Sequence, residues 1–311
     1  MSRVFLAVSI DCECDKGPRW RTRFPVRFEG VLEGIARRLQ PLFARHGAKP
    51  TYLLSSEVIR DEASANALAS LTGSHELGAH LHGDSVEPDV PLPAVTADFQ
   101  RDYPRDVERR KLALLTEQFV SAFGRRPRSF RAGRFGIGSS SLALLEELGY
   151  AVDSSVTPFV DWSRSGAPGL SFAAAPTQPY RPDLSVPERA GQGSILEVPV
   201  TIAPRPARAL PWVGRFLPGR ERWLRPTFSD ERELVDIARA EIERTRASAP
   251  GRPIVLNAMF HNVEIVPHAS PYARNEASCA RILGRLAALL RFAETHGITA
   301  VGLADVPELL S

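Results

Sequence analysis

Residues 4–15 read Val-Phe-Leu-Ala-Val-Ser-Ile-Asp-Cys-Glu-Cys-Asp, an apolar run that passes into three alternating acids. The first seven of these residues are β-prone and continuous in apolarity, as in a buried parallel strand. If the chain stays extended, Asp11, Glu13 and Asp15 project from one face, because strand side chains alternate. Three converging carboxylates repel one another unless a cation or a shared proton neutralises them, so this segment predicts a metal site.

One local pattern recurs along the chain and determines the fold class. A helical stretch ends at a glycine, and a β-prone run begins a few residues later; glycine ends helices because it easily adopts the left-handed conformation. The pattern occurs at Gly47, Gly73, Gly124, Gly149 and Gly297. Repeated units of strand, helix and strand predict a parallel sheet.

Several segments have the composition of strands. They are approximately residues 4–10, 50–55, 76–80, 129–133, 151–155, 194–202, 253–260 and 298–303. Seven or eight such units predict an α/β fold, a closed or partly closed β/α barrel whose chemistry lies at the carboxyl ends of the strands. We expect a single catalytic domain over residues 1–311, with irregular insertions at about 156–193 and 204–226.

The composition excludes several classes of protein. With 39 Lys and Arg against 36 Asp and Glu, the net charge of +3 does not favour a nucleic-acid partner. No apolar run is long enough for a transmembrane segment, and the first strand has no signal-peptide features before it. Three cysteines, Cys12, Cys14 and Cys279, do not make a disulfide framework. We therefore expect a soluble, cytoplasmic protein with reduced thiols.

A second ligand-rich segment, residues 78–84, reads Gly-Ala-His-Leu-His-Gly-Asp and overlaps the end of an expected strand. His80 and His82 lie two residues apart, and their small neighbours allow close approach. Zinc and related ions favour imidazole nitrogen with carboxylate oxygen, and a catalytic site keeps positions open for water. Two histidines and one carboxylate from residues 11–15 therefore predict a hydrolytic metal site.

Five segments occur in the order of the motifs of the polysaccharide deacetylases, the NodB-homology proteins of carbohydrate esterase family 4. They are Asp11 with Glu13, the block at His80, residues 129–136 (Ser-Phe-Arg-Ala-Gly-Arg-Phe-Gly), residues 152–158 (Val-Asp-Ser-Ser-Val-Thr-Pro) and residues 259–262 (Met-Phe-His-Asn). The chain resembles this superfamily from residue 1 to about 305, and within it the intracellular branch with Asp-x-Glu and His-x-His motifs. The resemblance implies a distorted β/α barrel of seven or eight units that binds a divalent ion, preferably zinc, and removes N-acetyl or related acyl groups from sugars.

The resemblance also implies catalytic roles. Asp11 matches the base that accepts a proton from the metal-bound water, and Arg131 the arginine that keeps this base charged. His261 matches the general acid that protonates the leaving nitrogen. Asp153 matches the acid that orients His261, although a turn-capping role before Ser154 is an equal alternative.

The implied metal ligands are Glu13, His80 and His82. In the superfamily the second histidine usually follows the first by four residues, and that position is Asp84 here. His82 is therefore the preferred third ligand, with Asp84 in reserve. Asp15 is an alternative to Glu13.

Three classes of function fit these residues. The first is a metal-dependent deacylase of an N-acylated sugar or glycan, free, polymeric, nucleotide-linked or lipid-linked, whose acetate release would vanish with a chelator and in Asp11→Asn. The second is a non-catalytic carbohydrate-binding relative without stoichiometric metal. The third is a ferrous oxygenase with two histidines and a carboxylate, which the alternation of helices and strands disfavours because such triads usually lie on all-β folds.

Two further segments have weaker interpretations. The run from Arg205 to Pro226 mixes arginines with aromatic residues and is interpreted as an exposed irregular insertion, with a lid, a glycan-phosphate patch or a membrane-surface contact as alternatives. The polar loop after His261, which contains Glu264 and Tyr272, is a candidate for sugar contacts or a simple connector.

Overall fold

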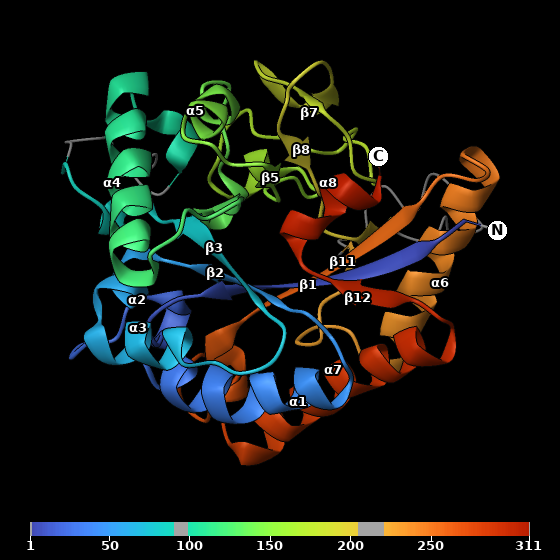
Figure 1. Cartoon of the computed structure of the whole chain (residues 1–311), viewed down its shortest axis with the longest axis horizontal. Coiled ribbons are helices and arrows are strands. Elements are labelled where there is room, and N and C mark those ends of the chain that lie inside the picture. Colours follow the sequence, from blue (N-terminus) through green and yellow to red (C-terminus); the bar gives the residue numbers. More distant parts are fainter. Residues whose placement is uncertain (1, 90–98, 205–220, 311) are drawn as a thin grey trace.

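The computed structural model describes residues 2–89, 99–204 and 221–310, and its centre is a curled parallel sheet (Figure 1). The strand order is β11-β1-β2-β3-β4-β5-β8, and β12 pairs with β1 beside β2. The strands are β1 (Val4–Cys12), β2 (Thr51–Leu54), β3 (Glu76–Leu81), β4 (Ser129–Ala132), β5 (Val152–Asp153), β8 (Leu196–Glu197), β11 (Ile254–His261) and β12 (Thr299–Val301). Every strand expected from the sequence is therefore present, and the distorted α/β barrel is confirmed.

Helices connect these strands and cover the outside of the sheet (Figure 1). They are η2 (Gly30–Leu39), α1 (Gln40–Arg45), α2 (Ser56–Arg60), α3 (Glu62–Ala69), α4 (Arg105–Phe123), α5 (Ser141–Glu147), α6 (Glu231–Ser248), α7 (Glu276–Thr295) and α8 (Val306–Leu309). The five glycines expected to end helices all have positive φ, between 56° and 85°. This backbone conformation is costly for other residues, so these glycines help to define the turns into the following strands.

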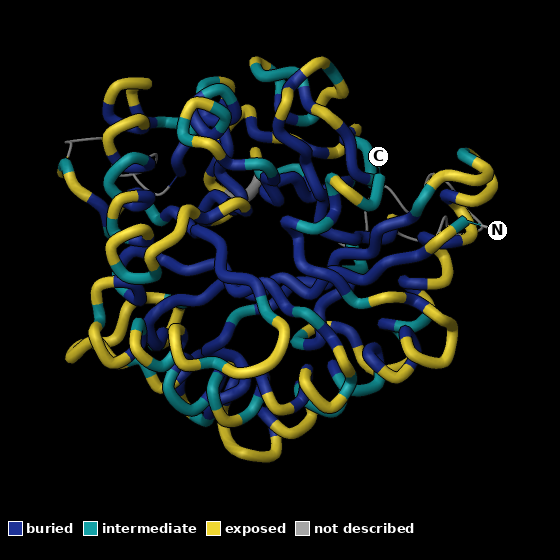
Figure 2. Tube along the Cα trace, viewed as in Figure 1, coloured by how far each residue is buried: buried dark blue, intermediate teal, exposed yellow. Residues whose placement is uncertain are grey.

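Strand β1 is the centre of the core. All nine of its residues are buried, and it pairs with β11 through an eight-residue register. Figure 2 shows the same pattern for the sheet as a whole, with buried strands inside and exposed outer helix faces. Burial of a side chain such as Leu6 or Ile10 contributes roughly 1.5–3 kcal/mol to the stability of the fold. Since every position of this strand is buried, its sequence is a nearly continuous apolar run.

The sheet is not closed by a regular strand pair between β8 and β11. Instead, the Thr201 amide donates to the Asn257 carbonyl at 2.9 Å, and the Met259 amide donates to the Leu224 carbonyl at 3.2 Å. Leu224 in turn donates its amide to the Thr201 carbonyl at 2.9 Å. These irregular contacts join the two edges of the sheet and account for the distortion of the barrel.

The chain around residues 156–203 is less regular than the rest. It contains η6 (Trp162–Ser165), an antiparallel pair of β6 (Pro182–Asp183) and β7 (Val186–Ala190), and β9 (Ile202–Ala203), which pairs with β10 (Arg222–Trp223). Most of the insertion expected at 204–226 lies outside the described residues. No helix in the described ranges is both long enough and apolar enough to cross a bilayer.

Candidate metal centre and active site

The strand register brings the polar residues to one rim of the sheet. Asp11 lies opposite His261 on the paired strands β1 and β11, and His80 lies beside Arg131 on β3 and β4. In parallel strands the carboxyl ends share one edge, so these four side chains converge although they come from distant parts of the sequence. The structure therefore places these four side chains at the rim where the sequence predicted the site.

Glu13, His80 and His82 form a group that could hold a metal ion, with donor atoms all within 4.8 Å of one another. The Oε1 atom of Glu13 lies 3.1 Å from Nε2 of His82 and 3.5 Å from Nε2 of His80. Glu13 and His80 are almost fully buried, and His82 is partly exposed. One carboxylate oxygen and two imidazole nitrogens that leave one side open are a donor set suited to a catalytic zinc ion.

The hydrogen bonds of His80 fit the role of a metal ligand. Its Nδ1 atom lies 3.0 Å from the carbonyl oxygen of Arg131, which can only accept, so Nδ1 carries the proton. Nε2 therefore presents a lone pair toward Glu13, and this buried atom has no hydrogen-bond partner. A backbone carbonyl that fixes the tautomer in this way is typical of metal-binding histidines.

Glu13 is held in place by two residues, Lys16 and Asn262, to which the sequence interpretation gave no role toward Glu13. The buried Lys16 places Nζ 2.8 Å from Oε2 of Glu13, on the side away from the histidines. The side chain of Asn262 accepts a hydrogen bond from the amide of Glu13 at 3.0 Å and donates one to its carbonyl at 3.1 Å. Burial alone would raise the pKa of Glu13, but Lys16 and His82 bring it well below the ordinary value. The carboxylate is therefore charged and oriented.

The two alternative ligands lie elsewhere. Asp15 accepts hydrogen bonds from the amides of Glu29 and Gly30 at 3.2 and 3.0 Å, so it stabilises the start of η2. The expectation that three carboxylates share one face is wrong for Asp15, because the strand ends at Cys12 and the backbone turns beyond it. Asp84 is exposed and is outside the group of ligand atoms.

Asp11 is paired with Arg131 as expected. Nη1 of Arg131 lies 2.7 Å from Oδ1 of Asp11, and the guanidinium group, which is completely buried, also donates to Ser9 Oγ and to the carbonyl and hydroxyl of Ser154. Burial would raise the pKa of Asp11, but the charge and the hydrogen bond of Arg131 outweigh it and lower the pKa. Asp11 is therefore a carboxylate at neutral pH, as a general base must be.

His261 completes the rim. Its Nε2 atom lies 3.8 Å from both Oδ2 of Asp11 and Oε1 of Glu13, so it faces the metal group. Its Nδ1 atom lies 3.0 Å from Oε1 of the fully buried Glu264. Glu264 is ionised, because Arg225 overcomes the effect of burial and lowers its pKa to about 2. The charged carboxylate accepts a hydrogen bond from Nδ1–H, which leaves Nε2 as the atom that can exchange a proton toward the site.

Asp153 does not contact His261, and the expectation that it orients this histidine is wrong. It is buried on β5, where it accepts a hydrogen bond from Ser155 Oγ at 2.7 Å and lies beside Glu197 of β8. Burial raises the pKa of Asp153. Burial and the neighbouring charge of Asp153 raise the pKa of Glu197 well above its ordinary value. The carboxylate that contacts His261 is that of Glu264, which lies in η7 (Asn262–Ile265), only three residues beyond His261.

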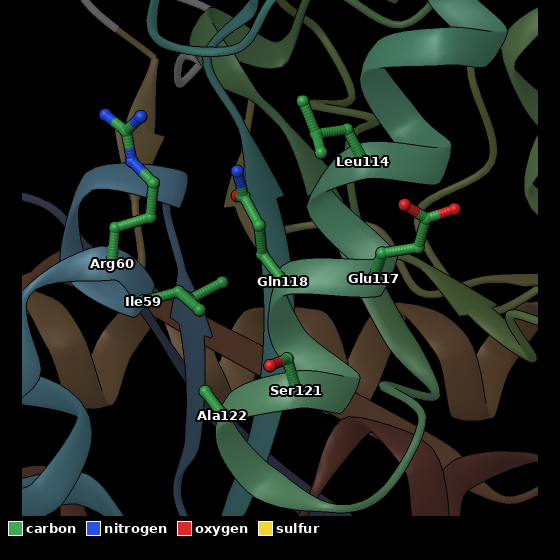
Figure 3. A pocket seen from close by; sticks show the side chains of 7 residues that line it. All are labelled: Ile59, Arg60, Leu114, Glu117, Gln118, Ser121 and Ala122. Carbon is green, nitrogen blue, oxygen red and sulfur yellow. The ribbon is translucent and has the colours of Figure 1, made fainter.

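A cavity of about 130 Å³ adjoins the metal group on the side of His82. Lys16, Cys14, Glu57 and Asp84 also line it. Figure 3 shows a different cavity, of about 380 Å³, between α2 and α4; it contains no member of the metal group. Of these two cavities, the smaller one is therefore the one that adjoins the metal group.

The fold is shared with solved structures of carbohydrate-active proteins. A candidate polysaccharide deacetylase from Mycobacterium smegmatis has a TM-score of 0.54 and 18% identity, over 98% of this chain and 90% of its own. A candidate glycoside hydrolase/deacetylase from Parabacteroides distasonis has a TM-score of 0.68 and 13% identity, over 99% and 71%. A candidate polysaccharide deacetylase from Pseudomonas aeruginosa has a TM-score of 0.55 and 15% identity, over 99% and 90%.

These similarities confirm the resemblance at the level of fold: the chain has the NodB-type barrel of the polysaccharide deacetylases. No family model matches the sequence, and a search of the curated proteins finds no match. The assignment to the intracellular branch stays a prediction.

Proposed function

We propose that this protein is a metal-dependent hydrolase that removes an N-acetyl or related acyl group from an amino sugar or glycan. The observation that carries the proposal is the grouping of Glu13, His80 and His82 beside two candidate proton carriers, Asp11 and His261. A hydrolytic site requires both a metal position and groups that move protons on either side of it.

The first half of the reaction uses Asp11. When held by Glu13, His80 and His82, a zinc ion supplies a water whose pKa is lowered from about 15.7 toward about 7, and it polarises the acyl oxygen. Asp11 accepts a proton from the attacking water while the new bond between oxygen and the acyl carbon forms. Arg131 keeps Asp11 ionised before this step and bonds it in the correct orientation.

The second half uses His261. An amide nitrogen leaves only after protonation, so the protonated imidazole donates the Nε2 proton as the bond between carbon and nitrogen breaks. The charged Glu264 stabilises the imidazolium that this step requires, and Arg225 keeps Glu264 charged. The products are the free carboxylate and the amino sugar.

Metal analysis combined with an acetate-release assay tests the proposal. We expect about one zinc ion per chain, and release of acetate from at least one N-acetylated sugar, glycan, or nucleotide or polyprenyl conjugate. Chelation should abolish the release and zinc should restore it. His80→Ala should lose the bound metal and the activity together, with a zinc affinity lower by at least about 100-fold, since outer partners of ligands alone contribute 10–100-fold.

Two results would reject the deacylase. A stable protein that binds sugars without stoichiometric metal would select the non-catalytic relative. A fully metal-loaded protein that releases acetate from none of these compounds would point to another acyl group or another hydrolysis. The cytoplasmic location also stays a prediction; Cys12, Cys14 and Cys279 are buried free thiols in the structure.

A further inference from the structure

The segment shortly after the candidate metal ligand Glu13 is an exposed, positively charged loop. Residues 17–28, which we call the basic loop, contain four arginines and no acidic residue. In the part of the chain that the structure describes, no carboxylate forms an ion pair with Arg19, Arg21 or Arg27, and all three are exposed. The loop therefore presents positive charge that the protein itself does not neutralise.

The basic loop also exposes apolar side chains. Phe24 is 81% exposed, more than any other large apolar residue in the described ranges, and Val26 is 40% exposed. Two further exposed rings, those of Tyr272 and Phe228, contact each other with centroids 5.3 Å apart. The remaining large apolar residue that is exposed in these ranges is Val120 on α4. Exposed apolar groups that gather in one region mark an interaction surface.

Contacts hold the basic loop at the rim of the reaction centre. The ring of Trp20, within the loop, has its centroid 4.7 Å from that of His261 and 5.4 Å from that of Tyr272. The loop is closed on itself, since the Gly17 amide donates to the Arg21 carbonyl at 2.7 Å. The exposed arginines and apolar side chains of the loop therefore belong to the same end of the barrel as the metal group.

We propose that the basic loop docks on an anionic lipid bilayer, so that the rim with the metal group faces the lipid headgroups. Anionic headgroups attract unpaired arginines, and apolar side chains such as Phe24 and Val26 can enter the boundary between headgroups and acyl chains. A soluble polyanion would also attract the arginines but would leave both apolar side chains in water. This contact requires neither a bound metal nor deacylation, so the inference goes beyond the proposed function.

Sedimentation with extruded vesicles tests the docking. The full chain is mixed with vesicles of phosphatidylcholine alone, or of equal parts of phosphatidylcholine and phosphatidylglycerol. We expect binding to the mixed vesicles and little binding to phosphatidylcholine alone, because the arginines require negative headgroups. Raising the ionic strength from about 0.1 M to about 1 M shortens the Debye length from about 10 Å to about 3 Å, so it should weaken the binding.

Two variants measure the charged and the apolar parts of the contact. The double variant Arg21→Gln with Arg27→Gln should weaken binding to the mixed vesicles by about 30-fold, because each arginine near an anionic surface contributes about fivefold. Phe24→Ser should weaken binding by about 10-fold, because the ring no longer leaves water. Both changes lie at exposed side chains, so the fold should be kept, which thermal unfolding checks.

Matched controls lie at the opposite end of the barrel, around the turn that leads into β4. Arg125→Gln with Arg126→Gln removes the same charge from two exposed arginines, and Val120→Ser removes an exposed apolar side chain. Each control should keep the affinity within about threefold, because these groups lie far from the docked surface and are screened.

The outcomes separate the docking from the proposed function. No binding to the mixed vesicles overturns the docking, and so does an equal loss in the two double variants, which would reflect net charge alone. Native affinity in Phe24→Ser overturns the lipid surface, and tight binding of heparin would then identify a soluble polyanion. None of these measurements uses acetate release, so the deacylase stands if the docking fails. Vesicle binding by a zinc-loaded protein that releases no acyl group keeps the docking and rejects the deacylase.

Discussion

Two sets of buried carboxyl groups lie on the same sheet but differ in their partners. At the rim, each carboxylate has its own cation, in the pairs Asp11 with Arg131, Glu13 with Lys16, and Glu264 with Arg225. On β5 and β8, Asp153 and Glu197 instead face each other. Both sets are removed from water, so desolvation alone would raise every one of these pKa values.

The presence or absence of a paired Lys or Arg decides in which direction the pKa of each carboxyl group is shifted. The pKa values of the three rim carboxyls are lowered, and those of Asp153 and Glu197 are raised. A carboxylate that must bind a metal, accept a proton or stabilise an imidazolium has to be charged at neutral pH. The pairing therefore separates the carboxyls suited to chemistry from the pair on β5 and β8, which holds a proton inside the barrel.

The largest expected effect is on the general base. Asp11→Asn should lower kcat by about 10³-fold, because the water then lacks its proton acceptor, while zinc content is kept. Thermal stability should fall, because the buried Arg131 loses its counter-charge. Asp153→Asn, which touches neither Asp11 nor His261, should keep kcat within about tenfold. Steady-state kinetics with metal analysis checks both variants. The comparison fails if Asp153→Asn is as inactive as Asp11→Asn.

The next effect is expected at Lys16, the cation that pairs with the candidate metal ligand Glu13. Lys16→Met should lower the free energy of unfolding of the metal-free protein by about 3 kcal/mol, because it leaves the buried charge of Glu13 without its partner. Zinc should reduce this loss, since the ion supplies the missing positive charge. Urea unfolding with and without zinc measures it. Lys49→Met, which removes a partly exposed pair with Asp305, should cost less than about 1 kcal/mol in both states. Equal losses in the two variants would contradict the assignment of Lys16.

A smaller effect is expected at the proton donor. Glu264→Gln should lower kcat by about 10- to 100-fold, because the imidazolium of His261 loses its counter-charge. Zinc content and thermal stability should be kept, which a merely structural role of Glu264 would not allow. A kcat close to the native value would show that Glu264 does not act on His261.

The smallest effect concerns Glu197. Its raised pKa means that the folded protein keeps a proton that the unfolded chain releases near the ordinary value of 4.5. Stability should therefore be greatest below that value and fall as the pH rises toward the raised pKa, by up to about 1.4 kcal/mol per pH unit. Glu197→Gln should flatten this dependence in thermal unfolding of the metal-free protein between pH 5 and 8. An unchanged slope would mean that the pair is ionised in the fold.

The sequence predicted the features that depend on local patterns. The apolar runs of β1 and β11 and the five glycines before the strands were sufficient to predict the strand segments and a parallel sheet. Asp11, His80 and His261 were found because each lies at the carboxyl end of a strand. These features repeat along the chain, so they can be recognised without knowing the tertiary contacts.

The partners of these residues depend on contacts that no local pattern encodes. Lys16 reaches Glu13 only because the chain turns after Cys12. Arg225 lies 39 residues before Glu264 in the sequence, and only the packing of the loops brings them together. Glu264 itself had a recognisable signal, its position three residues after His261, but the resemblance to a family motif favoured Asp153 instead.

The double hydrogen bond between Asn262 and the backbone of Glu13 links the residue after the proton donor to the metal ligand itself. Strands β1 and β11 are also paired along eight residues, so the sheet itself fixes the position of Asp11 relative to His261. In the mechanism we propose, the separation between base and acid is thus set before any substrate arrives, and the entropic cost of aligning them is met during folding. Substrates of this mechanism should then differ mainly in how well they fit the fixed distance between Asp11 and His261.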